Sequence, residues 1–559
     1  MNSLGRKRAP LLTASALFAT VRARAEWLYA LAVAGIVVLF VQDALARALA
    51  NWDTTDGDQG GYLRLALKVW TGDGFSSGVY HPLYALLLQP LAARDWLFFT
   101  HAKFFSIAIA SVGLVILYVL GRRLFGPGPA LLATAALAFT DLYRAYAART
   151  EPEVLITVLF FAAWAAWTIG FRSPRWWWLA GPLAGLAYMA KGTGQFLLLG
   201  FLLVPLLRYG WRGLMSRRVW GLVGLYFVGA SPLLIEKTLT DHNPFYDENS
   251  VHRMWYDSWD DRYATTGGSD VTMRTYFATH TPSQVIGRVA DGVSGVPRMW
   301  LAALRLDAPG ALQVMLLVAA LALAVVGAWS LLRQRGRDAE RAAVFSDTLW
   351  TFGALFVPTY LFFGWFMPVT ASPRFELPLV PIVYLLAAAL VWEGLAHLVP
   401  LAPTVAPLVA LAVVVVALAR GEWVAPGMVA ASDLGRNAPS VAVFNYLTHN
   451  ETLDEKIISG PGNLGQWPFY GLVSLEPIPN SLTEWGDVPG FIQEQRARHV
   501  VLSVRMVEKR RDLLEKYFHL TADGAGEDAI TFDTLPPGWT LVFAYPGRPC
   551  TYCVFRVQP

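Results

Sequence analysis

Long apolar segments separated by short polar loops dominate the chain as far as residue 420. A membrane-spanning helix needs about 20 predominantly apolar residues, and about eleven segments approach or reach that length. The predicted spans cover residues 27–49, 97–120, 128–146, 151–170, 176–190, 193–208, 219–238, 309–332, 347–367, 377–397 and 401–420. The fifth and sixth are short and are separated by Lys191 and Gly192. The pattern predicts an α-helical polytopic membrane protein.

The pattern changes after residue 430, where charged helical segments alternate with short β-rich ones. The predicted helices are Val441–His449, Phe491–Arg498 and Val507–Phe518, and the predicted strands are Lys456–Ser459, Val500–Val504, Thr540–Tyr545 and Cys553–Val557. Strands that alternate with helices indicate an α/β unit. We therefore expect a transmembrane domain over residues 1–430 and a soluble α/β domain over residues 435–559.

Basic residues indicate how the chain crosses the membrane, because they are enriched in cytoplasmic loops. They gather at the N-terminus and after even-numbered predicted spans, at Arg6, Lys7, Arg8, Arg22, Arg24, Arg122, Arg123, Arg172, Arg175, Arg208, Arg212, Arg217, Arg218, Arg333, Arg335, Arg337 and Arg341. We expect a cytoplasmic N-terminus that is not a cleaved signal peptide. With an odd number of spans, the C-terminal domain and two long loops, residues 51–96 and 240–305, lie outside, as in a bacterial inner-membrane protein.

Composition agrees with a membrane protein and excludes some functions. Of 559 residues, 55% are hydrophobic and 15% are charged, which is too few to cover the core of a soluble protein. The net charge of +4 is too small to indicate nucleic-acid binding. The only cysteines, Cys550 and Cys553, form either a local disulfide or two free thiols.

The first long loop carries the acidic residues Asp56 and Asp58 just before a short amphipathic helix, predicted over residues 62–70. Arg64 and Lys68 share the polar face of this helix, and Tyr62 lies on the apolar face. We expect such a helix to lie in the membrane interface. Two carboxylates spaced by one residue in an extended segment project to one side. They could bind a divalent cation, or one could act as a general base; the alternative is a solvated acidic turn.

Further ionisable residues lie at the outer ends of the predicted spans. His81 precedes the second span, Arg149 and Glu151 precede the fourth, Lys191 separates two short apolar halves, and Arg374 precedes the tenth. A charge near a membrane segment usually faces protein or water. A cation such as Lys191 or Arg374 suits an anionic group that enters from outside. The alternatives are interfacial anchoring or an ion pair with a neighbouring carboxylate.

Taken in order, these segments resemble the GT-C superfamily of membrane glycosyltransferases, in particular the protein O-mannosyltransferase and aminoarabinose-transferase group. The matching segments are residues 58–62 (DQGGY), 81–84 (HPLY), 120–126 (LGRRLFG), 148–152 (ARTEP), 191–192 (KG) and 374–378 (RFELP). The resemblance covers roughly residues 20–400. Two departures bear on metal use and on the sugar accepted. Gln59 replaces an acidic residue, and Glu151 replaces the commoner aspartate.

The resemblance implies an inverting transferase that moves a sugar from a polyprenyl-phosphate donor to an acceptor hydroxyl on a glycan, a lipid or a protein. The implied roles are general base for Asp58, orientation of the acceptor or of a Mg or Mn ion for Asp56 and Glu151, phosphate binding for Lys191, Arg374, Arg64 and Arg149, and substrate binding for Tyr62 and His81. The lipid tail is expected in an apolar groove built from spans within residues 176–240. Metal ligation, if present, would come from Asp56 and Asp58.

Two other functions remain open at this stage. A transporter or flippase for a lipid-linked or anionic substrate would carry charges near span centres and inverted repeats. The charges here gather at outer ends, and no internal repeat is visible. A receptor or assembly factor would need the membrane part only as an anchor, for which eleven spans are more than enough.

Overall fold

A computed structural model describes most of the chain. The described residues are 14–54, 56–258, 271–306, 310–334, 339–399, 401–421, 423–450, 456–459, 468, 475–476, 478–479, 481–522 and 528–558. The chain forms two compact units. Unit 1 comprises Met1–Asp43, Ile109–Ala145 and Glu153–Trp423, and unit 2 comprises Ala44–Ala108, Tyr146–Pro152 and Val424–Pro559.

Among the described residues, nine helical segments are long and apolar enough to cross a membrane. They involve α1 (Ala14–Ala50), α4 (Leu97–Phe125), α7 (Glu153–Gly170), α9 (Gln195–Tyr209) with η3 (Gly192–Gly194), α11 (Arg217–Asp241), α16 (Ala311–Gln334), α17 (Ala339–Phe366), α18 (Val380–Leu398) with η5 (Pro373–Leu379), and α19 (Ala402–Arg420). The predicted class of polytopic helical membrane protein is confirmed.

Two further predicted spans are helical but short. The segment predicted at 128–146 is divided into α5 (Pro127–Ala138) and α6 (Asp141–Ala147), and the segment predicted at 176–190 is α8 (Trp177–Ala190). With 12 residues in α5 and 14 in α8, each helix is roughly 20 Å long at about 1.5 Å per residue. The hydrocarbon core of a bilayer is about 30 Å thick. The sidedness assigned from the basic loops requires both segments to carry the chain across, and it stays a prediction.

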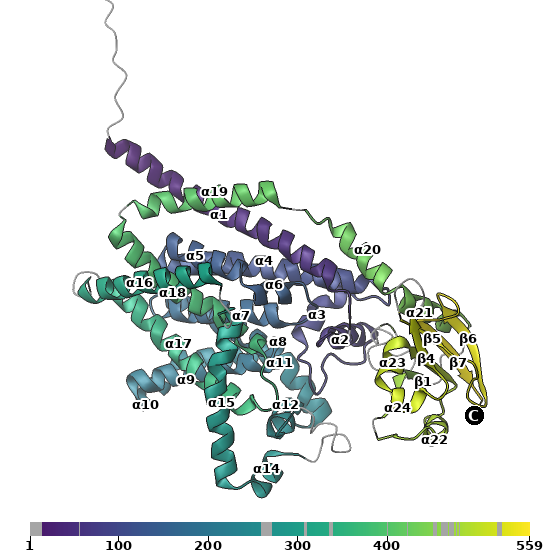
Figure 1. Cartoon of the computed structure of the whole chain (residues 1–559). Helices are drawn as coiled ribbons and strands as arrows, with labels where there is room; N and C mark the ends of the chain where they lie inside the picture. Colours follow the sequence, from purple (N-terminus) through teal and green to yellow (C-terminus); the bar gives the residue numbers. More distant parts are fainter. Residues whose placement is uncertain are drawn as a thin grey trace, which may run out of the picture. The chain divides into compact units, whose positions relative to one another are not determined.

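The helices of unit 1 pack in pairs, α8 with α11, α16 with α18, and α15 (Pro282–Ala303) with α17. Small residues allow close backbone approach, as is common between membrane helices. A Cβ atom on Gly327 of α16 would collide with the backbone of Leu390, and one on Gly394 of α18 would collide with that of Leu323. The Tyr29 hydroxyl of α1 donates a 3.0 Å hydrogen bond to the backbone of α19, and Figure 1 shows these two helices side by side. Gly327 and Gly394 therefore allow the close packing of α16 against α18.

The second predicted outer loop, residues 240–305, is largely helical. It contains α12 (Glu248–Val251), α14 (Met273–Thr279) and α15, and its residues 259–270 lie outside the described residues. Arg288 of α15 stacks on Trp365, with Cζ 4.5 Å from the ring centroid. The loop is therefore held against α17 by an aromatic contact as well as by helix packing.

The last part of the chain, in unit 2, forms the predicted α/β domain, drawn in yellow in Figure 1. Its main sheet has the strand order β2-β1-β3-β7-β6, with β1 (Ile457–Ser459), β2 (Leu475–Glu476), β3 (His499–Ser503), β6 (Trp539–Tyr545) and β7 (Tyr552–Val557). β1 is parallel to both of its neighbours, and β7 is antiparallel to both of its own. The helices are α21 (Ala438–Asn450), α22 (Asp487–Glu494), α23 (Val504–Lys509) and α24 (Arg511–Leu514), and β4 (His519–Ala522) pairs with β5 (Asp528–Thr531).

The two cysteines, Cys550 and Cys553, form a disulfide, which is the first of the two predicted states. Both side chains are buried in the hydrophobic core of the α/β domain, next to Phe555 and Ile530. The bridge therefore joins the end of the loop between β6 and β7 to the second residue of β7.

Within unit 2, the segment that leads into the α/β domain contacts the end of α1 and the residues that follow it. α20 (Pro426–Arg436) contributes Ser432, whose hydroxyl donates a 3.2 Å hydrogen bond to the Leu49 carbonyl. Asn437 donates to the Trp52 carbonyl at 3.0 Å. These bonds join the start of the first loop to the segment that precedes the α/β domain; the side of the membrane on which both lie stays a prediction.

Candidate active site

Asp58 lies at the N-terminal end of α2 (Gln59–Thr71), where the acidic loop of residues 51–58 meets the helix. Its side chain does not cap the helix, and the Tyr80 hydroxyl donates a 3.3 Å hydrogen bond to its Oδ1. The preceding Gly57 has a φ of 69°, a conformation that costs other residues about 1–2 kcal/mol. A Cβ atom there would also lie 2.5 Å from Glu151 Oε1. Glycine is therefore needed for the turn that presents Asp58.

Gln59, the first residue of α2, is fully buried and holds the loop that precedes it. Its Nε2 donates to the carbonyl oxygens of Asp53 at 3.0 Å and Asp56 at 3.1 Å. Its Oε1 accepts from Asn51 Nδ2 at 2.8 Å and from the backbone N–H of Thr150 at 3.2 Å. An ionised acid in this place could accept hydrogen bonds but not donate them. Gln59, which replaces the acidic residue implied by the resemblance, therefore holds the loop through hydrogen bonds that an ionised acid could not donate.

Arg149 connects two carboxylates of the cluster. It forms an ion pair with Asp56, and its Nε lies 3.9 Å from Glu151 Oε1. The Glu151 side chain is fully buried, and its Oε1 also accepts the backbone N–H of Asp58 at 3.3 Å. Burial lowers the pKa of Arg149, but the charges of Glu151 and Asp56 outweigh this effect and leave the pKa raised. The structure thus brings together four predicted site residues, which we call the acidic cluster: Asp56, Asp58, Arg149 and Glu151.

The other predicted site residues of unit 2 are Tyr62, His81 and Arg64, of which the first two are buried and the third is exposed. Tyr62 is buried, with its ring centroid 4.9 Å from that of Tyr80 and 5.6 Å from that of Tyr84. It therefore packs beside the tyrosine that donates to Asp58. His81 is buried just before α3 (Leu83–Leu88). Arg64 is exposed on α2, and no contact within the described residues links it to the acidic cluster.

The two carboxylates predicted to bind a divalent cation, Asp56 and Asp58, both have other partners in the structure. The Asp56 carboxylate is paired with Arg149, and Asp58 accepts a hydrogen bond from Tyr80. Across the part of the chain that the structure describes, no three His, Cys, Asp or Glu side chains group as metal ligands. The positive charge next to the acids comes from a guanidinium, so no chemical step is assigned to a metal.

A second cluster lies in unit 1, where Glu153 begins α7 and binds two cations. Its Oε1 accepts a 2.7 Å hydrogen bond from Lys191 Nζ and lies 3.8 Å from a guanidinium nitrogen of Arg374. Both cations also face the ring of Phe375, with Lys191 Nζ at 5.3 Å and Arg374 Cζ at 5.5 Å from its centroid. Glu153 is 2% exposed, whereas each cation keeps 22% of its side chain exposed. The structure thus joins two of the four predicted phosphate-binding residues, Lys191 and Arg374, in one cationic cluster.

Local backbone geometry explains why Lys191 lies at the break between α8 and α9. α8 ends at Ala190, and Lys191 is extended, with φ −162° and ψ 144°. A Cβ atom on Gly194 would collide with the backbone of Ala187 and Tyr188. The chain can therefore fold back into α9 only with glycine there, and this turn leaves Lys191 at the helix break that its sequence predicts.

Glu153 and Tyr80 are absent from the predicted site. Glu153 could have been identified from the sequence, since an acid at the start of a strongly apolar span is costly unless it is paired. Tyr80 could not, because the sequence of an aromatic-rich loop does not indicate which acid a tyrosine contacts.

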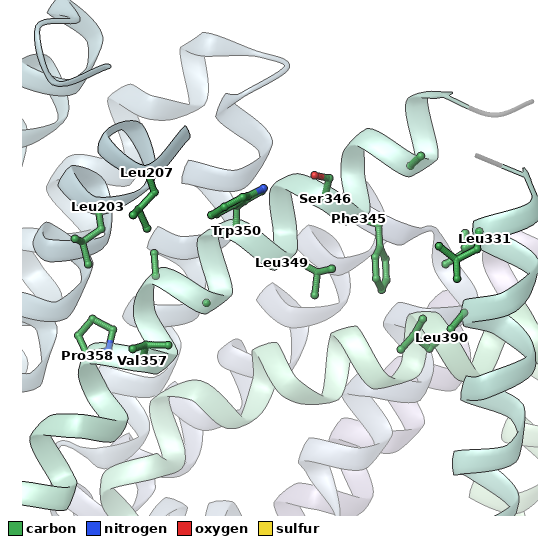
Figure 2. A pocket seen from close by; sticks show the side chains of 15 residues that line it. Leu203, Leu207, Leu331, Phe345, Ser346, Leu349, Trp350, Val357, Pro358 and Leu390 are labelled. Carbon is green, nitrogen blue, oxygen red and sulfur yellow. The ribbon is translucent and has the colours of Figure 1, made fainter. Parts of the chain in front are cut away.

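Unit 1 also contains an apolar cavity of about 920 Å³ between α9, α16, α17 and α18. Figure 2 shows its lining, which includes Leu203, Leu207, Leu331, Phe345, Trp350 and Leu390. No charged side chain of the described residues lines it. Of the region expected to form an apolar groove, residues 176–240, only α9 contributes to this cavity.

Comparisons with known proteins agree with this architecture. The family model described as dolichyl-phosphate-mannose-protein mannosyltransferase matches residues 99–235. Among solved structures, ArnT from Cupriavidus metallidurans bound to undecaprenyl phosphate is 15% identical, with a TM-score of 0.52 over 94% of this chain and 99% of that one. ArnT in the apo state gives a TM-score of 0.50 at 15% identity over the same shares of both chains. An oligosaccharyltransferase from Archaeoglobus fulgidus in complex with Zn and sulfate is 13% identical, with a TM-score of 0.47 over 89% of this chain and 73% of that one. A search of curated proteins gives no match.

The likeness to ArnT concerns the fold, and it extends over almost the whole chain. A polytopic helical region, an acidic loop before a short helix and a C-terminal α/β domain define a multi-pass membrane protein of the GT-C architecture. The resemblance to the GT-C superfamily of membrane glycosyltransferases, predicted from the motifs, is confirmed by the family model and by the fold.

Proposed function

We propose that this protein is an inverting glycosyltransferase that moves a sugar from a polyprenyl-phosphate-linked donor to an acceptor hydroxyl at the outer face of the membrane. The observation that carries the proposal is the acidic cluster, which presents Asp58 on a fold similar to that of ArnT, a protein solved with undecaprenyl phosphate. Nucleotide sugars are cytosolic, so an outer site needs a lipid-linked donor. The acceptor is a glycan, a lipid or a protein.

Asp58 is our candidate for the general base. The acceptor hydroxyl must lose its proton as it attacks the anomeric carbon, and a positioned carboxylate can take that proton. The hydrogen bond from Tyr80 and the backbone contact to Glu151 orient Asp58. Glu151 is fully buried and acts on the loop, whereas Asp56 is 60% exposed and can contact the acceptor. One displacement with one base inverts the anomeric carbon.

Lys191 and Arg374 are our candidates for binding the donor phosphate, which becomes the leaving group. Charge that develops on a leaving phosphate is stabilised by cations held in place beforehand. Glu153 holds both side chains while satisfying only part of their donors, since lysine has three and arginine five. Arg149 is better suited to organising the acidic cluster than to binding phosphate, because it is paired with Asp56. Arg64 remains a weaker candidate, exposed on α2.

The prenyl chain of the donor needs an apolar surface, and we propose that the cavity between α9, α16, α17 and α18 receives part of it. Its volume of about 920 Å³ and its uncharged lining suit a hydrocarbon chain. Gly353 lines the cavity, and the space beyond its Cα is open, since a Cβ atom there would meet nothing within 4 Å.

The test is transfer of a radiolabelled sugar from a panel of polyprenyl-phosphate donors to membrane extracts by the wild type and by Asp58→Asn. Asp73→Asn is the matched control, because Asp73 is an exposed acid just beyond α2 whose side chain contacts only Thr71 among the described residues. We expect Asp58→Asn to lose at least about a hundredfold in rate, the lower range for general acid–base catalysis. Asp73→Asn should keep wild-type activity.

Activity that survives Asp58→Asn would move the base to Asp56 or Glu151. A wild-type protein that consumes no donor in the panel would contradict the proposed function.

A further inference from the structure

Lys103 lies in the part of α4 that belongs to unit 2, and it is fully buried with all three ammonium donors in use. Nζ donates at 2.8 Å to the Ala48 carbonyl, at 2.8 Å to the Asn51 carbonyl and at 2.7 Å to Asp433 Oδ1. The last four carbonyl groups of a helix have no partner inside it, and a cation there also interacts favourably with the helix dipole. Lys103 therefore caps α1 and holds the first residue of the acidic loop.

Asp433, on α20, is the partner that completes this site, and it too is fully buried. Its second oxygen, Oδ2, accepts a 2.6 Å hydrogen bond from Thr100. A buried ion pair is an expensive way to gain stability, because apolar residues of similar size are often as good or better. Such a pair does, however, impose one geometry on the groups around it. The site is thus better explained by the position that it enforces than by the stability that it adds.

Asn51 carries this constraint from Lys103 to the acidic loop. Its side-chain amide pairs with that of Gln59 in both directions, with Nδ2 to Oε1 at 2.8 Å and Nε2 to Oδ1 at 3.1 Å. Asn51 Nδ2 also donates to the Ala148 carbonyl at 2.7 Å, next to Arg149 of the acidic cluster. Gln59 in turn donates to the carbonyl of Asp56 and begins α2 immediately after Asp58. Continuous hydrogen bonds therefore run from Asp433 to the acidic cluster.

We propose that the C-terminal segment positions the general base through this buried polar network, which consists of Asp433, Lys103, Asn51 and Gln59. Asp433 and Lys103 are positioning residues that act on Asp58 through the loop and do not touch substrate. The catalytic part of the inference rests on the proposed function. α20, the helix that leads into the C-terminal domain, is then part of the support of the active site.

The test uses full-length protein with the double substitution Lys103→Met and Asp433→Leu, which removes both charges together and avoids an unpaired buried ion. The first readout is hydrogen exchange of the peptide covering residues 48–62, and it needs no enzymatic activity. We expect exchange about tenfold faster, the equivalent of one lost buried hydrogen bond. The second readout is transfer kinetics, in which a misplaced base lowers kcat by about a hundredfold while the KM for the donor changes by less than about threefold.

Lys456→Met is the matched control, because Lys456 is a half-exposed lysine of the same unit that pairs with Gln495 and Glu476 on the α/β domain. It should leave both the exchange of residues 48–62 and kcat at wild-type values. Wild-type exchange in the double variant would overturn the inference, and so would faster exchange with unchanged kcat. If the wild type transfers no sugar, the proposed function fails and the exchange result alone decides whether the network holds the loop.

Discussion

Replacing Glu153 by Gln should tighten binding of an anionic donor while it weakens the fold of unit 1. Glu153 now neutralises one of the two cations that it contacts, Lys191 and Arg374. The substitution raises the net charge of this cluster by one. At an effective dielectric constant of about 20, a unit charge roughly 6 Å from a phosphate contributes about 3 kcal/mol. Both cations are 22% exposed, so solvent screens part of this electrostatic contribution. We therefore expect the Kd of the donor to fall about tenfold, which corresponds to about 1.4 kcal/mol.

The same substitution breaks a buried ion pair, which typically costs about 3–5 kcal/mol of stability. The assay is therefore twofold. Binding of a labelled polyprenyl phosphate is measured at low and high salt, and the thermal midpoint of the purified protein is measured alongside. Higher salt should reduce the gain in affinity, because it screens partly exposed charges.

Asp347→Asn is the matched control for Glu153→Gln. Asp347 is also a buried acid of unit 1 between two cations, Arg208 at 2.6 Å and Arg172 at 3.3 Å. Its substitution should lower the thermal midpoint in a similar way and leave donor affinity unchanged. Equal donor affinity in the wild type and a folded Glu153→Gln variant would refute the assignment of Lys191 and Arg374 to the phosphate. If Asp347→Asn instead increased donor affinity, the phosphate site would be assigned to Arg208 and Arg172, the partners of Asp347.

Four further predictions follow from the acidic cluster and the apolar cavity. Gln59→Glu should lower both the thermal midpoint and the transfer rate, because an ionised acid would face the two carbonyls that Nε2 now binds; a variant as active as the wild type would show that the amide is not needed. Gly57→Ala should cost about 1–2 kcal/mol and reduce kcat, with hydrogen exchange of the loop as the measurement; unchanged exchange and kcat would contradict this. Transfer should continue after dialysis against a chelator, because Arg149 already occupies Asp56; loss of activity that Mg or Mn restores would contradict the fit of charges described above. Gly353→Leu should fill open space in the cavity and slow transfer from long-chain donors more than from short-chain ones, with Gly353→Ala as control. An equal effect on both donors would show that the cavity does not bind the prenyl chain.

Much of the architecture could be predicted from the chain alone, because hydrophobic periodicity is a local signal. Apolar length identified the nine long membrane segments, and alternation of short strands with charged helices identified the α/β domain. The predicted strands at 456–459, 500–504, 540–545 and 553–557 correspond to β1, β3, β6 and β7. The pairing of β1 with a parallel neighbour on each side depends on contacts distant in sequence, and no local pattern indicates it.

The candidate site was predictable as a set of residues but not as a set of contacts. Glu151, Lys191 and Arg374 were selected because charged groups at the ends of apolar spans are conspicuous, and Asp58 because it lies in an acidic loop just before an amphipathic helix. Their partners were not, since Tyr80 and Asn51 are ordinary loop residues whose role depends on where the chain folds back. The predicted span at 128–146 also passed over Thr140 and Asp141, the polar residues at which the structure separates α5 from α6.

The bond between Lys103 and Asp433 joins residues 330 positions apart in the chain, and this separation has a consequence for biosynthesis. At about 5–20 residues per second, a ribosome needs roughly 15–65 seconds to make the intervening segment. Throughout that time Lys103 is in the membrane-inserting chain without its acidic partner, and the end of α1 lacks its final clamp. A nascent chain truncated before α20 would therefore expose an unfinished acidic loop to proteases and quality control. The protein acquires its proposed activity only after α20 has been translated and Asp433 has reached Lys103.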